Sequence, residues 1–72
     1  MKTHRCEDWS HLAGAEVAIH RHGRLLRVGV VDAVMPNDNV LWLASDYNGH
    51  RTIFESAEGY EAWVDPKDVP EP

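Results

Sequence analysis

The sequence predicts an all-β domain, a small barrel of five short strands, and three observations lead to it. The chain has 72 residues, enough for one domain with a core of minimal size. Its apolar residues recur with the period of two that is typical of half-buried strands. Turn-forming residues interrupt this pattern roughly every 7–12 residues, and no helical pattern exceeds a turn or two.

The stretch 24–44 is the centre of the predicted fold. Two β-rich runs, predicted as strands over residues 25–34 and 40–44, flank the turn formers Pro36-Asn37-Asp38-Asn39. Gly29 lies inside the first run, and a glycine there indicates a bulge or a bend, as at a barrel corner. The second run has no polar member, so we expect it to be covered on both faces or to lie at an interface.

The remaining strands are predicted on either side of this centre, over residues 16–20, 52–55 and 60–64. The side chains of the first and last of them alternate between apolar and other residues. His22-Gly23 and Asn48-Gly49 are the expected turns. A 3₁₀ turn is predicted over residues 65–69. Residues 1–14 form a separate N-terminal segment, a short helix or a lid in which Trp9 covers an open end of the core. The barrel then spans residues 15–69, and residues 70–72 are a tail.

Part of this pattern resembles a known fold. Gly29-x-Val31-x-x-Val34, with Asp38 and the apolar run 40–43, is similar to the first hairpin of SH3-like small barrels, including the KOW type. The wider pattern over residues 15–69 resembles a group of short uncharacterised bacterial proteins. It consists of Gly23, residues 27–32, residues 41–44, Arg51, Phe54 and residues 59–63. The resemblance implies a five-stranded SH3-like barrel and brings no activity with it. KOW-type barrels usually bind nucleic acid or ribosomal partners through basic loops, whereas the loops 36–39 and 46–50 are neutral or acidic here.

Charge and composition restrict the function classes. The formal net charge is −5, with five Lys/Arg against three Asp/Glu in residues 1–31 and two against nine in residues 32–72. An acidic domain repels phosphate backbones, which disfavours nucleic acid as a partner. The lone cysteine, Cys6, excludes an internal disulfide framework. No apolar run approaches the roughly 20 residues of a membrane span, and the start has no apolar signal region. We therefore expect a soluble, cytoplasmic and bacterial protein.

Candidate residues for catalysis and metal binding are few. His20 and His22 would place two imidazoles on one face of a strand, a spacing that can chelate zinc or copper. A third ligand would have to come from His4, Cys6, His11 or His50, and no local motif selects one. The serines lack a nucleophile motif, and the acidic pairs lie in exposed-looking segments. We expect no enzyme activity, no bound metal and no cofactor.

Aromatic and arginine side chains suggest binding instead. The chain has six large rings, more than a narrow barrel interior can hold, and rings beside arginines are typical of interface hot spots. We expect a binding or adaptor module that recognises a protein partner through Arg24, Arg27, Trp42, Arg51, Tyr60 and Trp63.

Two alternatives remain open for the arginines. In the first, Arg21, Arg24 and Arg27 form a basic stripe that binds nucleic acid or clamps a phosphate or other anion. In the second, the arginines pair within the chain with residues such as Glu55 or Glu61, each pair contributing about 0–1 kcal/mol at the surface.

Self-association follows from the apolar run 40–44. Its apolar side chains lie on both faces of the strand, whereas a small barrel buries only one face of each strand. The leftover face, with Trp63 or Tyr60, would form an apolar patch, and we expect a homodimer to cover it. The competing explanation is that Trp9 and the N-terminal segment fold back over that face.

Overall fold

The protein is all-β, as the sequence predicted. The computed structural model describes residues 3–35, 37–44, 49–65 and 67. A single antiparallel sheet runs in the order β1-β6-β2-β3-β4-β5. Its strands are β1 (His4–Cys6), β2 (Glu16–Arg21), β3 (Arg24–Met35), β4 (Val40–Leu43), β5 (Thr52–Glu55) and β6 (Tyr60–Val64). Two 3₁₀ turns, η1 (Trp9–His11) and η2 (Ser56–Glu58), complete the described residues, which contain no α-helix.

The sheet has six strands where the sequence predicted five. The additional strand is β1, which pairs with β6 at the sheet edge through His4 opposite Val64 and Cys6 opposite Ala62. A polar three-residue strand carries no alternation of its own, so nothing local marks it. Because β6 already has β1 on one side and β2 on the other, both of its edges are occupied. The sheet is not closed, and β1 and β5 are its two ends.

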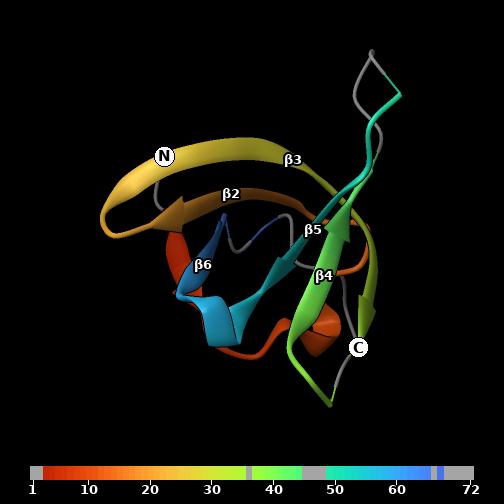
Figure 1. Ribbon diagram of the computed structural model, residues 1–72, viewed down its shortest axis with the longest axis horizontal. Helices are drawn as coiled ribbons and strands as arrows, with labels where there is room; N and C mark the ends of the chain where they lie inside the picture. Colours follow the sequence, from red (N-terminus) through yellow and green to blue (C-terminus); the bar gives the residue numbers. More distant parts are fainter. Residues whose placement is uncertain (1–2, 36, 45–48, 66, 68–72) are drawn as a thin grey trace.

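Strand β3 is the long strand that connects the two parts of the sheet. Its first half pairs with β2 and its second half with β4. The register shifts twice, once where Leu26 is skipped between the pairs Ile19–Arg27 and His20–Leu25, and once at Asp32. Figure 1 shows β2 and β3 curving together while the β4–β5 hairpin crosses below their bend.

Gly29 does not occupy a bulge, which corrects the sequence prediction. It lies opposite Val17 in regular register, between the two shifts. A Cβ atom placed on Gly29 would lie 3.3 Å from Cδ1 of Leu43, a side chain of β4 that is fully buried. The glycine is therefore needed because β3 approaches the core side chains of β4 closely, and the register shifts of β3 lie at Leu26 and Asp32.

The predicted turn between β2 and β3 is confirmed. His22 and Gly23 have φ angles of 53° and 76°, and two successive positive φ angles are the signature of a type I′ turn. The turn makes Arg21 and Arg24 direct cross-strand partners. Its twist matches that of the flanking strands, so the hairpin continues without splaying.

One core joins the sheet to the N-terminal segment. Trp9 and Leu12 are buried with Ile19, Leu41 and the other core side chains. The Trp9 indole donates its Nε1 hydrogen to the Cys6 carbonyl at 3.0 Å, so the ring is buried without an unpaired donor. Trp9 is thus a central core residue, and this segment supplies β1 and η1.

Asn39 ties three segments together at the start of β4. Its Oδ1 accepts a hydrogen bond from the Trp9 amide at 2.8 Å, and its Nδ2 donates to the Glu7 carbonyl at 2.6 Å. Its own carbonyl accepts from the Ser56 amide at 3.0 Å. Asn39 has a φ of 52°, a left-handed conformation that asparagine tolerates better than most residues.

Two further predictions fall largely outside the described residues. Residues 45–48 lie outside the described part, and so does most of the turn expected at Asn48-Gly49. The 3₁₀ turn expected over residues 65–69 also lies largely outside it. A 3₁₀ turn that the sequence did not predict is η2, which Gly59 ends with a φ of 90°. Among the described residues, no helix is long and apolar enough to cross a membrane.

Candidate functional site

The outer face of the β2–β3 hairpin, the side turned away from the core, is unusually apolar. Residues opposite each other across a pair of strands share a face. Val28 lies opposite Ala18 and Leu25 opposite His20, on the face opposite the buried Val17 and Ile19. The exposed fractions are 58% for Leu25, 49% for Leu26, 54% for Val28 and 45% for Val30. We call these four side chains the β3 apolar row.

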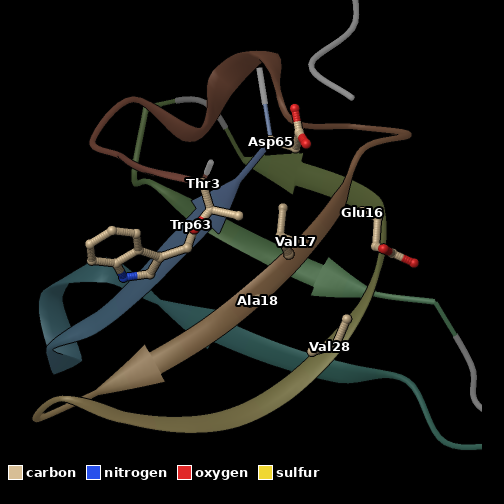
Figure 2. Close-up of a pocket in the computed structure, with 7 residues that line it drawn as sticks. All are labelled: Thr3, Glu16, Val17, Ala18, Val28, Trp63 and Asp65. Atoms are coloured by element: carbon tan, nitrogen blue, oxygen red, sulfur yellow. The ribbon is translucent and has the colours of Figure 1, made fainter. Parts of the chain in front are cut away.

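A hollow of about 160 Å³ lies beside the β3 apolar row. Figure 2 shows its lining, which crosses β3, β2 and β6 with Trp63 on one side and Val28 and Glu16 on the other. Val17, Ala18, Thr3 and Asp65 complete it. The hollow therefore has an apolar centre and two carboxylates at its rim.

Trp63 is held in place on this face. Its ring lies against His20, with 5.6 Å between ring centroids, and its Nε1 donates to Oε1 of Glu61 at 3.2 Å. Glu61 in turn forms an ion pair with Arg5 at 3.6 Å. Of the six residues that the sequence singled out for binding, Trp63 is the one that lines the hollow.

The other two predicted rings lie elsewhere. Trp42 is half-buried and shares its row with Ala33 and Ile53, between the buried Leu41 and Leu43. Tyr60 packs on the core, edge-on to Phe54 with 5.0 Å between centroids. An apolar outer face is present at the predicted strand, where the half-buried Trp42 lies beside the exposed Ile53. A second exposed apolar surface, which the sequence did not predict, belongs to β3. The buried Trp9 covers the core and not an outer face.

The predicted arginines divide into two groups. Arg51 forms an ion pair with Asp32 at 2.7 Å, in agreement with pairing inside the chain, although the partner differs from those considered. Arg21, Arg24 and Arg27 lie on the core-facing side of the hairpin, since Arg27 is opposite the buried Ile19 and Arg24 is opposite Arg21. Arg24, Arg27, Trp42, Arg51, Tyr60 and Trp63 thus do not form one surface.

Contacts on the core side order two of these arginines. The Cζ atom of Arg21 lies 4.8 Å from the Tyr60 ring centroid, and its Nε is buried with no hydrogen-bond partner. Arg27 donates from Nη1 to Oγ1 of Thr52 at 2.6 Å. We call Arg21, Arg24 and Arg27 the hairpin arginine cluster.

The predicted metal pair is not assembled. His20 lies on β2 against Trp63, whereas His22 belongs to the turn and not to the strand. Within residues 3–35, 37–44, 49–65 and 67, no three His, Cys, Asp or Glu side chains gather closely enough to hold a metal ion.

The N-terminal segment contains two groups with shifted acidity. Burial raises the pKa of the Cys6 thiol, which donates to the Asp8 carbonyl at 3.0 Å. A raised pKa lowers the thiolate fraction and therefore the reactivity of Cys6. Hydrogen bonds from Ser10 lower the pKa of Asp8, whose carboxylate caps η1.

Sequence reasoning missed the β3 apolar row. A signal was present, because Val28 and Val30 alternate with Arg27 and Gly29. That alternation predicts two faces without saying which one is buried. The skipped residue Leu26 then places Leu25 on the outer face with them.

Comparisons with known proteins identified no relative of this chain. No family model matches the chain, and neither a curated protein nor a solved structure is significantly similar to it.

Proposed function

We propose that the protein is a small binding module that recognises a protein partner through the β3 apolar row and the adjoining hollow, and that this partner is a second copy of the chain. The observation that carries the proposal is the exposure of Leu25, Leu26, Val28 and Val30, at 45–58% each, on one strand of the sheet. Contiguous apolar surface of this kind is typical of interaction sites.

The residues around the row favour a partner that is also protein. Trp63 is half-buried, and its ring is oriented by His20 and Glu61. Because the ring is already ordered, it would lose little side-chain entropy on binding, as is typical of a hot-spot residue. Two carboxylates, those of Glu16 and Asp65, lie at the rim of the apolar hollow. An apolar centre with a polar rim is the usual anatomy of a protein interface.

The polar residues at the two ends of the row favour a homodimer. Glu16 is opposite Val30 at one end, and the exposed turn residue His22 lies beyond Leu25 at the other. A two-fold axis through Val28 would bring Glu16 of one copy to the turn of the other, where an imidazole N–H of His22 can donate to the carboxylate. The row would then face itself, as an isologous interface requires.

The curvature of the sheet bears on whether a partner can reach the β3 apolar row. We infer that the sheet curls in the manner of an SH3-like small barrel. The inference is supported by the two register shifts of β3 and by the single core that β2, β4, β5 and β6 share. A curled sheet keeps the β3 apolar row on its convex side, where a partner can reach it.

Nucleic acid is the less favoured partner. The chain carries a net charge of −5, and its hairpin arginines lie on the core-facing side of β2 and β3. Phosphate-backbone binding needs cations spread over an accessible surface. The proposal assigns no catalytic residue and no cofactor.

Light scattering and sedimentation at micromolar concentration test the proposal. The wild-type chain should have a mass above the 8.2 kDa of one copy. Val28→Asp places a charge in the middle of the row and should therefore reduce the measured mass to that of one copy. Ile53→Asp is the matched control, because Ile53 is 51% exposed on β5, away from the row. A monomeric wild type, or equal dissociation by the control, would overturn the homodimer.

A further inference from the structure

The hairpin arginine cluster is an unusual arrangement of charge. Arg21 and Arg24 are direct cross-strand partners on either side of the His22-Gly23 turn. Side chains in such a pair start about 4.5–5.5 Å apart at Cβ, and like charges placed there repel. Neither arginine forms an ion pair with a carboxylate in the described part of the chain.

The cluster is also partly ordered before any ligand binds. Arg21 lies over the Tyr60 ring at 4.8 Å, and Arg27 is held by the Thr52 hydroxyl at 2.6 Å. Tyr60 lies beside Arg21 on the neighbouring strand β6, where the two are direct cross-strand partners, and Thr52 belongs to β5. Phe54 bridges them, since it is on β5 and touches the Tyr60 ring. Arg21 and Arg27 are therefore each held by a contact with a residue outside the hairpin.

An unsatisfied donor adds a second observation. The Nε of Arg21 is buried and has no hydrogen-bond partner. A buried donor on a charged group costs free energy until an acceptor reaches it. Its neighbour Arg24 is exposed and offers the planar fork of donors that matches two oxygens of one anion.

We propose that the hairpin arginine cluster binds an oxyanion, a phosphate or carboxylate group, at the turn end of the β2–β3 hairpin. The anion is held by Arg21 and Arg24, while Arg27 and Tyr60 fix the shape of the site. One bound anion would relieve the repulsion between Arg21 and Arg24 and would lie near the buried Nε. The site is on the opposite face of the hairpin from the β3 apolar row, so the two can be occupied together.

Nuclear magnetic resonance of the full chain tests the proposal, with inorganic phosphate and acetate as the probes at constant chloride. The Nε–Hε signals of Arg21 and Arg24 should shift and saturate. Phosphate binding tighter than acetate would assign a phosphoryl ligand, and the reverse order would assign a carboxylate. Both outcomes support the site.

Charge-matched variants complete the test. Arg24→Gln should weaken the binding about tenfold or more, because a charge-assisted hydrogen bond is lost. Arg5→Gln removes the same charge from β1, where Arg5 is paired with Glu61, and should weaken binding by less than about twofold, as expected for a distant screened charge. The amide spectra of both variants show whether the fold is kept. Absence of saturable shifts with either anion, or equal weakening by both variants, would overturn the proposal.

Discussion

Strand β6 and the tip of the β2–β3 hairpin distribute polarity in opposite ways. In β6, Ala62 and Val64 are buried and Glu61 lies on the outer side. At the hairpin tip, the arginines are on the core-facing side and Leu25 is exposed on the outer side. The β6 pattern is what folding of a single chain requires. The reversed pattern does not serve the core, and the two binding surfaces proposed above are argued from it.

The largest expected difference comes from placing a carboxylate in each region. Ala62→Asp puts an unpaired charge on a residue with no exposed surface, and we expect a loss of about 3–5 kcal/mol in the free energy of unfolding. Val28→Asp, on a side chain that is 54% exposed, should cost no more than about 1 kcal/mol. Urea unfolding followed by tryptophan fluorescence in dilute solution measures both. Equal losses would mean that the outer face of β3 is buried in the monomer.

The next effect concerns the contact that places β3 against the core. Gly29→Val should lower the free energy of unfolding by about 1–3 kcal/mol, because even a Cβ would lie 3.3 Å from Leu43 Cδ1. Gly29→Ala should cost less. Combining Gly29→Ala with Leu43→Val makes room for the new methyl group, so the two losses should be less than additive in urea melts. Strict additivity would show that the two residues do not compete for space.

Asn39 connects the N-terminal segment to the sheet, and its loss should have a similar or slightly smaller effect. Asn39→Ala removes hydrogen bonds to the Trp9 amide and the Glu7 carbonyl and strains a φ of 52°. We expect a loss of about 1–3 kcal/mol in the free energy of unfolding. Asn39→Gly keeps the backbone conformation, so the difference between the two variants in thermal melts isolates the strain. Identical melts for the two variants would assign the whole effect to the hydrogen bonds.

The smallest effect has the opposite sign. Arg24→Glu converts the like-charged pair with Arg21 into an oppositely charged pair, and should raise the free energy of unfolding by about 0.2–1 kcal/mol. The same variant should lose phosphate and acetate binding. Arg24→Gln should be intermediate in stability. A destabilised Arg24→Glu chain would show that Arg24 is needed for folding and would remove the contrast with β6.

Local pattern was sufficient for most of the strands. Alternation and turn chemistry predicted β5 and β6 with the observed bounds, residues 52–55 and 60–64. They also predicted the turn at His22-Gly23, because a type I′ turn depends on two neighbouring residues. The sequence also indicated more large rings than the core could hold, and Trp63 was among those assigned to the surface.

Tertiary structure decided which face each of these side chains occupies. A single skipped residue, Leu26, sets the face of Leu25 and Arg24 at the hairpin tip, and such a shift has no local signature. Strand β1 pairs with the edge of β6 that would otherwise be open. Gly29 is required because Leu43 approaches it from another strand. The hairpin arginine cluster depends on the same register. The sequence alone determined that most of these segments form strands. Pairing between distant strands determined which side chains each strand buries and which it leaves exposed.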